Sequence, residues 1–315
     1  MSKRQTDRLL PLRRWFMVEG NHLFSQVIFS GGTGRSGTTI VGRLLSRHSQ
    51  VTMAKPAEIK FLTAGNGILD LSQRRRVGKY KKLIFNDRLH LERFKYRLFH
   101  DWWERESKTG GKAGLIQGIS ESDLRAIYRN LKTNYAKDSR AATQAFMHEF
   151  VTMQLAQAEK YFWIDTTPIN IYRANEIAKL LPGSKFIHMV RDGRDVIASA
   201  IRERWGPTNY EDGLAWYRKR MIRNLTNGIA LQDQLLTLSL EDLVIRKRDE
   251  SIEKLLKFLG LENEKKFIEF FNNTMLESSI TRGRWKKEVP DVKALNRAYA
   301  DLVAEFKGID SKVPL

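Results

Sequence analysis

A glycine-rich stretch near the N-terminus has the residue types and spacing of an anion-binding loop. It follows the apolar run 27–29 and precedes a helical pattern. Such a loop points several backbone N–H groups and a helix N-terminus at one spot, where a phosphate can bind. The alternative is a tight strand-to-helix turn that needs glycine only for steric reasons. The residues that we expect to bind the anion are Gly34, Arg35, Ser36, Gly37, Thr38 and Thr39.

The loop departs from the pattern of P-loops that bind nucleoside triphosphates. That pattern, G-x-x-x-x-G-K-[ST], would begin at Gly32, and its lysine position holds Thr38. The cation lies inside the loop instead, at Arg35, where a guanidinium can bind an oxygen that gains charge. The sequence therefore predicts a phosphate site that is not built for a magnesium-bound triphosphate.

Arg191 and Ser199 form a second candidate phosphate site. Arg191 follows the apolar run 185–190, and Ser199 lies about two turns into the next expected helix. An arginine can bind a phosphate through two parallel N–H groups, and the serine hydroxyl can add a further contact. Alternatively, Arg191 forms an ion pair with Asp192 or Asp195 at a strand–helix corner.

The loop and the arginine–serine pair together resemble the sulfotransferases that use 3′-phosphoadenosine 5′-phosphosulfate (PAPS). The resemblance continues in Pro168 and in residues 181–199, 240–244, 258–261 and 283–286. It covers about residues 25–65 and 160–290, and it is absent from about 66–150.

The resemblance implies a co-substrate, a reaction and a set of residues. PAPS would donate a sulfuryl group to a hydroxyl or amine of an acceptor. The loop would bind the 5′-phosphosulfate, and Arg191 with Ser199 would bind the 3′-phosphate. The residues that would close over the adenosine end are Arg282, Gly283, Trp285 and Lys286.

The segment Glu58–Leu62 is similar to the E-x-[HK]-F-[FL] element of the carbohydrate and heparan-sulfate-like branch of this family. There the glutamate is the general base, so the resemblance assigns that role to Glu58 and places Lys60 as a second cation near the sulfuryl group. A carboxylate beside cations in a partly dry cleft can act as a base if its surroundings tune its pKa. Without the resemblance, Glu58 would read as a surface glutamate and Lys60 as a solvated lysine.

One position departs from the family pattern. Where the family has a lysine after the next strand, this chain has Thr166, so one expected positive charge is missing and Arg35, Lys60 or Lys286 would have to compensate. His188 lies in a predicted buried strand, and we expect a hydrogen-bonded core residue there. We expect no metal, because no cluster of histidine and acidic residues has metal-ligand spacing. A sulfuryl group also carries less charge than a γ-phosphoryl group and has less need of Mg²⁺.

The elements that would position these residues alternate between strands and helices. Strands are predicted at 27–31, 51–54, 161–165, 185–190 and 235–240, and helices at 38–47, 171–181, 196–204 and 252–259. This alternation predicts an α/β fold, a P-loop-like parallel sheet flanked by helices, in one domain over 1–315. The glycine loop, Glu58, Thr166 and Arg191 would then meet at the carboxyl ends of the strands.

Residues 66–150 read as a helical insertion. They contain an expected basic amphipathic helix pair within 66–112, a loop at 108–112, and helices at about 121–133 and 139–159. Trp102 and Trp103 can stack on sugar rings, but at helical spacing tryptophans are more often core residues. Since the family pattern is lost in this insertion, we expect it to shape the acceptor site.

Composition narrows the possible partners. The chain has a net charge of +19 and no cysteine, and it lacks a long apolar run, so we expect a cytoplasmic protein without a membrane span. Residues 1–24 read as a basic arm. An anionic glycan or glycolipid acceptor would suit the charge, with peripheral membrane contact as an option, although a solvated basic surface is the plain alternative.

Two other functions compete with sulfuryl transfer. A kinase with a degenerate phosphate loop would turn over ATP with Mg²⁺, but Thr38 in the lysine position argues against it. A nucleic-acid-binding protein would use the basic segment 66–112 and bind with steep salt dependence. That segment has no recognisable nucleic-acid motif, so nucleic acid is the weaker expectation.

Overall fold

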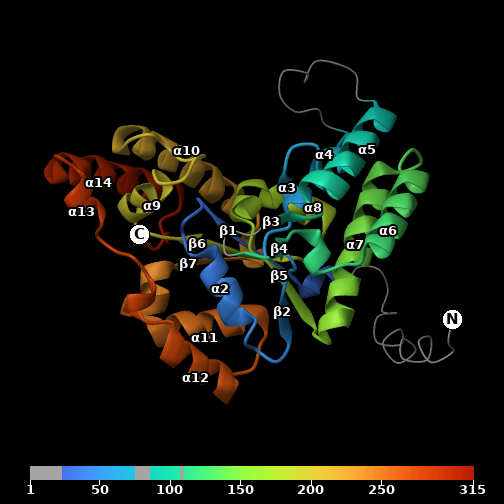
Figure 1. Ribbon diagram of the computed structural model, residues 1–315. Coiled ribbons are helices and arrows are strands. Elements are labelled where there is room, and N and C mark those ends of the chain that lie inside the picture. The colour runs from blue at the N-terminus through green and yellow to red at the C-terminus, as the bar shows by residue number, and fades with distance from the viewer. Residues whose placement is uncertain (1–22, 75–85, 107–109) are drawn as a thin grey trace. The chain divides into compact units, whose positions relative to one another are not determined.

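The central element of the fold is a five-stranded parallel sheet in the order β2-β5-β1-β6-β7 (Figure 1). The structure is a computed structural model that describes residues 23–74, 86–106 and 110–315. β6 and β7 pair with Val190 opposite Ser239. The strands are Val27–Gly32 (β1), Val51–Met53 (β2), Phe162–Asp165 (β5), Lys185–Val190 (β6) and Leu235–Ser239 (β7).

Every residue of β1 and β5 is buried, as expected for strands of a parallel sheet with both faces covered. The chain divides into two compact units. The first comprises 1–28, 54–163 and 177–184, and the second comprises 29–53, 164–176 and 185–315. The chain passes from one unit to the other within β1 and again within β5.

The second unit contains most of the sheet and its flanking helices. In Figure 1, α9, α10 and α14 lie on one side of the sheet, and α2, α11 and α12 lie on the other. The helices are α2 (Thr38–Leu45), α9 (Gly193–Ala200), α10 (Tyr210–Ile229), α11 (Arg248–Leu259), α12 (Lys265–Thr274), α13 (Trp285–Glu288) and α14 (Val292–Ile309). A further helix, α8 (Ala174–Leu180), begins in this unit and ends in the first.

The first unit is largely helical, and its core is aromatic. The ring of Phe61 lies 5.0 Å from Phe150 and 5.6 Å from Phe146, edge to face. Trp102 is buried beside Phe94, with the guanidinium of Arg97 over its ring, so it is a core residue. The elements are α3 (Lys60–Thr63), α4 (Ile68–Ser72), α5 (Asp87–Tyr96), β3 (Arg105–Glu106), β4 (Lys112–Ala113), α6 (Glu121–Asn134) and α7 (Ser139–Ala158).

Most predicted elements are confirmed, and the differences lie at their ends. α9 begins at Gly193 rather than 196, because the Asp192 side chain caps the helix by accepting from the Arg194 amide. The predicted helix 171–181 starts as a 3₁₀ turn, Pro168–Arg173, before α8. α11 begins at Arg248 and ends at Leu259, and it is capped by Gly260, whose φ of 72° suits a glycine.

Parts of the basic insertion lie outside the described residues. These are 75–85, which hold part of the predicted helix pair, and 107–109, which begin the predicted loop; residues 1–22 of the basic arm are likewise outside. The described part shows α5 followed by a π-helical turn, Arg97–Asp101, and a two-stranded hairpin in which Lys112 pairs with Glu106.

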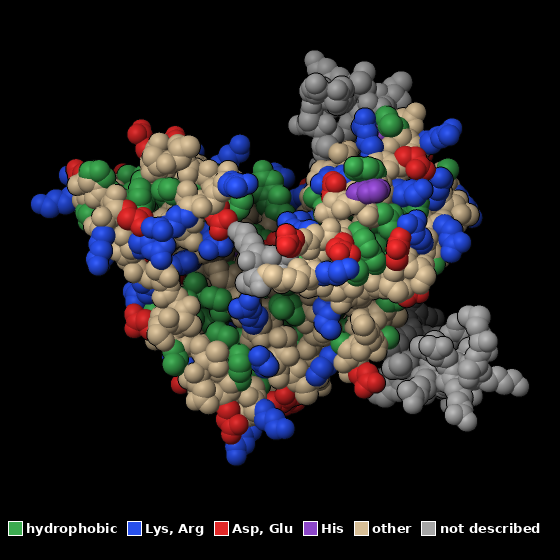
Figure 2. All heavy atoms as spheres, viewed as in Figure 1, with side chains coloured by type: hydrophobic (Ala, Val, Ile, Leu, Met, Phe, Trp, Pro, Cys, Tyr) green, Lys and Arg blue, Asp and Glu red, His purple; other side chains and the backbone are tan. Residues whose placement is uncertain are grey.

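Surface charge is spread over both units. On the face shown in Figure 2, lysine and arginine side chains are scattered among carboxylates rather than gathered in one patch. None of the described helices is long and apolar enough to cross a membrane. Within the same residues, no group of three or more histidine and acidic side chains could hold a metal ion.

Candidate active site

The glycine loop joins β1 to α2 in the second unit, and its first glycines are required by close packing. A Cβ on Gly32 would lie 2.4 Å from the Met189 carbonyl oxygen and 2.4 Å from Ser36 Oγ. Gly37 has a φ of 94° and caps α2, whose first backbone hydrogen bonds are donated by Ile40 and Val41. The amides of the preceding residues are therefore available at the helix N-terminus.

Ser36 is the buried centre of this loop. Its side chain is fully buried, and Oγ has no hydrogen-bond partner among the described residues. Buried hydroxyls are normally hydrogen-bonded, so an unpaired one beside free helix amides fits a ligand oxygen. This observation supports the predicted anion site.

Thr166 occupies the place of the expected family lysine, and packing explains its size. The residue is fully buried, and a Cβ on Gly42 of α2 would lie only 2.3 Å from its Cγ2. The helix thus approaches the end of β5 at Gly42, where Thr166 fills the gap. Thr166 is therefore a buried packing residue between the end of β5 and α2.

Arg35 adopts a left-handed backbone conformation in the loop, with φ 59°. Its Nε donates to Ser199 Oγ at 2.8 Å, and its Nη1 lies 3.6 Å from Glu203 Oε1. The structure therefore brings together Arg35 and Ser199, which are far apart in sequence. Since the Arg35 side chain is nearly half exposed, the ion pair with Glu203 is weak and can open.

Arg191 joins the loop to a distant segment. Its Nη1 donates to the Arg35 carbonyl oxygen at 3.0 Å, and its Nη2 donates to the Thr281 carbonyl oxygen. The residue is 9% exposed, and its Nε has no partner among the described residues. Burial lowers the pKa of Arg191, whereas Asp195 and Glu241 raise it. The alternative of a direct ion pair with Asp192 or Asp195 is not seen, because the guanidinium binds carbonyl oxygens.

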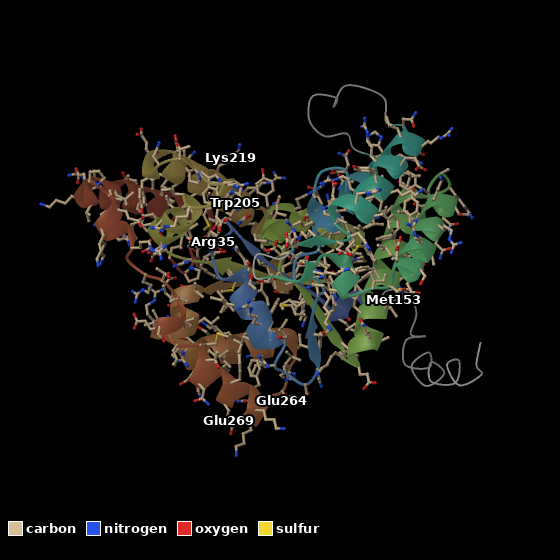
Figure 3. All side chains as sticks on the ribbon, in the orientation of Figure 1. Arg35, Met153, Trp205, Lys219, Glu264 and Glu269 are labelled. Carbon is tan, nitrogen blue, oxygen red and sulfur yellow. The ribbon has the colours of Figure 1, made fainter. Side chains whose placement is uncertain are left out.

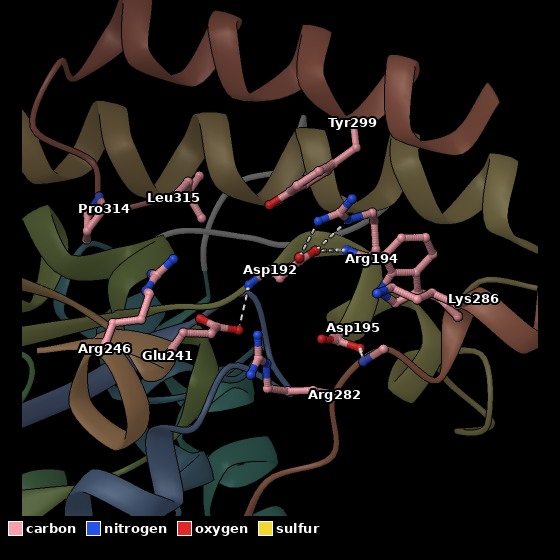
Figure 4. A pocket seen from close by; sticks show the side chains of 12 residues that line it. Asp192, Arg194, Asp195, Glu241, Arg246, Arg282, Lys286, Tyr299, Pro314 and Leu315 are labelled. Carbon is pink, nitrogen blue, oxygen red and sulfur yellow. Dashed lines mark hydrogen bonds and ion pairs between the residues drawn. The ribbon is translucent and has the colours of Figure 1, made fainter. Parts of the chain in front are cut away.

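The four residues predicted to cover the adenosine end line one cavity of about 460 Å³ (Figure 4). Arg282 and Lys286 are exposed, and Gly283 donates its amide to Asp195 Oδ1 at 2.7 Å. Burial raises the pKa of Asp195. The residues that line the cavity are Asp192, Arg194, Asp195, Glu241, Arg246, Arg282, Gly283, Trp285, Lys286, Tyr299, Pro314 and Leu315.

Trp285 differs from the other three, because it is buried. Its ring packs against Ala198 and Leu295, and the Arg194 guanidinium lies 4.4 Å from the ring centroid. Arg194 is itself fixed by Asp192, with Nη2 2.6 Å from Oδ2. Trp285 therefore holds the segment that contains Arg282 and Lys286 in place.

Glu58 and Lys60 belong to the first unit, whereas the residues above belong to the second. Glu58 is half-buried, and Lys60 begins α3, with its amide donating to the Glu58 carbonyl oxygen. Burial and the nearby Arg105 lower the pKa of Lys60, while Glu58 raises it. The next residue, Phe61, anchors α3 in the aromatic core.

A buried glutamine fixes the chain just before Glu58. Gln154 Nε2 donates to the Lys55 carbonyl oxygen at 2.6 Å, and Gln154 Oε1 accepts from the Lys55 amide at 3.1 Å. The same oxygen accepts from Trp163 Nε1 at 2.7 Å. The position of the Glu58 segment is thus set from α7, about a hundred residues away in sequence.

Several neighbours of the loop were not found from the sequence. Arg220 of α10 is partly buried, donates from Nη1 to the Thr33 carbonyl oxygen at 3.1 Å, and stacks on Trp216. Trp205 lies against Gly34, and Glu203 faces Arg35. In the sequence, only a group of tryptophans and arginines within 204–223 marks these residues. That group does not show that the glycine loop is their partner.

His188 is the core residue that its strand predicts. It is fully buried, and the Asn224 amide lies 3.4 Å from Nε2. Burial lowers the pKa of His188 to about 4, so the imidazole is neutral near neutral pH.

Comparison with known proteins identifies the family of this chain. A family model described as the sulfotransferase family matches residues 27–265. Among solved structures, sulfotransferase STF9 from Mycobacterium avium is 11% identical with a TM-score of 0.51, covering 95% of this chain and 80% of its own. The sulfotransferase domain from the curacin biosynthetic pathway is 14% identical with a TM-score of 0.50, covering 89% of this chain and 96% of its own.

At these identities, the two structures show a shared fold alone. No curated protein sequence matches at a significant level. The family model nevertheless spans most of the chain, including the loop, Glu58, Arg191 and Ser199. The chain therefore belongs to the sulfotransferase family and is an enzyme of that class.

Proposed function

We propose that this sulfotransferase takes its sulfuryl group from PAPS and transfers it to a hydroxyl or amine of an anionic glycan or glycolipid. The observation that carries the donor assignment is a pair of buried polar atoms without partners among the described residues, Ser36 Oγ and Arg191 Nε. Ser36 lies in the glycine loop, Arg191 follows β6 and binds the Arg35 carbonyl oxygen of that loop, and both atoms are hydrogen-bond donors that suit phosphate oxygens. Two separate donor positions fit a ligand with two phosphate groups.

The roles of the loop residues follow from their geometry. Amides at the start of α2, with the hydroxyls of Ser36, Thr38 and Thr39, would hold the 5′ end of the donor. Arg35 would stabilise the phosphate oxygen on which negative charge develops as the S–O bond breaks. For this, its side chain must exchange Ser199 and Glu203 for the donor.

Arg191 and Ser199 would bind the 3′-phosphate. The carbonyl oxygens of Arg35 and Thr281 already fix the Arg191 side chain, and its Nε has no partner among the described residues. Binding a phosphate oxygen at Nε would therefore cost little further side-chain entropy. Ser199 is released when Arg35 turns to the 5′ end. Arg282, Gly283 and Lys286 would cover the adenosine end, and Trp285 would support them from the core.

Glu58 would be the general base, a role that rests on its sequence element. The acceptor oxygen forms a bond to sulfur, the bond from sulfur to the phosphate oxygen breaks, and the acceptor proton goes to the Glu58 carboxylate. Lys60 would stabilise the sulfuryl oxygens. The insertion over 66–150 would contribute to acceptor selection in this single catalytic domain.

Ligand binding tests the donor assignment. Calorimetry should show that adenosine 3′,5′-bisphosphate binds at least tenfold more tightly than AMP, because only the former has a 3′-phosphate for Arg191. The Arg191→Ala variant should remove this preference. Arg218→Ala is a matched control, since Arg218 is an exposed arginine of α10 that pairs with Glu305. Equal affinity for the two nucleotides, or turnover of ATP with Mg²⁺, would refute the assignment of PAPS as the donor.

A further inference from the structure

Trp205 is a tryptophan exposed beside the catalytic loop. It lies between α9 and α10 and is 52% exposed. Its Cη2 atom would be 3.7 Å from a Cβ on Gly34, so the ring lies against the loop at the residue before Arg35. Single exposed apolar residues are common on proteins. An exposed indole in contact with this loop is informative, because it lies beside the residues proposed to bind the sulfuryl donor; Figure 3 shows Trp205 next to Arg35.

A second tryptophan fixes Trp205 to the loop. The ring centroids of Trp205 and Trp216 are 6.2 Å apart, with an interplanar angle of 33°. The Arg220 guanidinium lies 4.5 Å from the Trp216 centroid on α10, and the same side chain donates to the Thr33 carbonyl oxygen. The loop, Arg220, Trp216 and Trp205 thus form one connected wall, and such support reduces the entropy cost of stacking a ligand on Trp205.

Cations continue this wall along α10. Lys219 and Arg223 follow Trp216 at spacings of three and seven residues, which places them on the same side of the helix. Both are exposed, and within the described parts of the chain neither has a carboxylate at ion-pair distance. Arg218, one residue away, is paired with Glu305. The side of α10 next to the tryptophans therefore carries uncompensated positive charge.

We propose that Trp205 is the acceptor platform of this enzyme, on which one sugar ring of an acidic glycan stacks while Lys219 and Arg223 bind the carboxylates of adjoining sugars. The inference rests on the proposed function, since it requires the sulfuryl donor in the loop beside Gly34. From Trp216 to Arg223 the helix rises on the order of 10 Å. Lys219 and Arg223 occupy about 6 Å of this length, and an aromatic platform with two cations beside it suits an extended acidic chain better than a single small aromatic acid.

The test uses the protein saturated with adenosine 3′,5′-bisphosphate and two probes of equal length. Hyaluronan hexasaccharide has alternating carboxylates, and chitohexaose is neutral. Calorimetry should show tighter binding of the hyaluronan hexasaccharide. Trp205→Ala should weaken it roughly tenfold or more, as expected for loss of one stacked ring, and Trp205→Phe should restore part of the loss. The double variant Lys219→Ala, Arg223→Ala should remove the preference for the charged probe.

Controls separate this inference from the donor assignment. Tyr96→Ala removes an aromatic ring that is 61% exposed on α5 of the first unit, and it should leave hexasaccharide binding unchanged. Trp205→Ala should bind adenosine 3′,5′-bisphosphate like the wild type, which also reports an intact fold. If it does so and still binds the hexasaccharide normally, or if the wild type binds 2-naphthoate but neither hexasaccharide, the acceptor platform is refuted while the donor site stands. Failure of the wild type to bind the bisphosphate refutes the proposed function itself.

Discussion

The glycine loop and the Glu58 segment are built in different ways. In the loop, the proposed binding groups are backbone amides and the side chains of Ser36 and Arg35, and Gly32 is required because a Cβ there would lie too close to Met189 and Ser36. In the Glu58 segment, the chemistry belongs to half-buried side chains at the start of the four-residue helix α3. The packing of Phe61 in the aromatic core and the hydrogen bonds of Gln154 fix the position of this segment.

This difference indicates that donor binding and sulfuryl transfer depend on separate segments. A loop of fixed amides binds the same phosphates whatever the acceptor is, because its geometry is set by the backbone. The Glu58 side chain precedes a four-residue helix, and its position depends on side-chain contacts of neighbouring residues rather than on the backbone alone. Donor binding and transfer should therefore respond to different substitutions, and each prediction below probes one side of the comparison.

Glu58→Gln should have the largest effect on transfer. If Glu58 is the base, the rate of sulfuryl transfer should fall by roughly 100- to 10,000-fold, because the amide cannot accept the acceptor proton. The affinity for adenosine 3′,5′-bisphosphate should remain that of the wild type, since Arg191 and Ser199 are untouched. Turnover with labelled PAPS and calorimetry measure the two quantities. Glu106→Gln, at an exposed glutamate of the same unit, is the control, and retained turnover in Glu58→Gln would remove the residue from its role.

Gln154→Leu should destabilise the protein by removing the hydrogen bonds that fix the chain just before Glu58. The Lys55 amide and Trp163 Nε1 would lose the oxygen that accepts from them, and the Lys55 carbonyl oxygen would lose its donor, so the free energy of unfolding should fall by roughly 2 to 4 kcal/mol. Urea unfolding measures this. Gln144→Leu, at a half-exposed glutamine of the same helix, should have little effect. If Gln154→Leu lowers the affinity for adenosine 3′,5′-bisphosphate by as large a factor as it lowers the rate of sulfuryl transfer, donor binding and transfer do not depend on separate segments. That result would contradict the comparison above.

Acid should lower the free energy of unfolding through His188, which lies three residues before Arg191 of the proposed donor site. Burial lowers the pKa of His188 to about 4, so between the unfolded and folded pKa values the unfolded state binds the proton and the native state does not. Stability is present above the unfolded value and falls as the pH drops toward about 4. From about pH 8 to pH 5 this group should cost about 2 kcal/mol of unfolding free energy.

The His188→Gln variant tests this pH dependence. It keeps a polar group near Asn224 without a titrating ring, so urea titrations at several pH values should give a flatter profile than the wild type. Replacing the exposed His100 in the same way should leave the profile steep. Equal profiles for wild type and His188→Gln would show that His188 does not govern acid stability.

The sequence was sufficient for what is local. The loop was predicted because strand, glycines and helix follow one another, and the buried strands around Trp163 and His188 were predicted from apolar runs. Gln154 could not be connected to Lys55, nor Arg220 to Thr33, because these contacts join residues far apart without any periodic signal. The departure at Thr166 is visible in the sequence, but its packing against Gly42 of α2 is not.

Glu203→Gln should have the smallest effect, and with the opposite sign. Glu203 lies 3.6 Å from the Arg35 guanidinium and competes with an anionic ligand for it. Because the Arg35 side chain is nearly half exposed, the pair is weak, and removing the carboxylate should tighten bisphosphate binding by only about two- to threefold. Glu269→Gln removes the same charge from α12 and should leave the affinity unchanged, so a matching gain there would mean that net charge alone sets affinity. A gain confined to Glu203→Gln would instead show that Arg35 leaves Glu203 when the donor binds, as the proposed role of the loop requires.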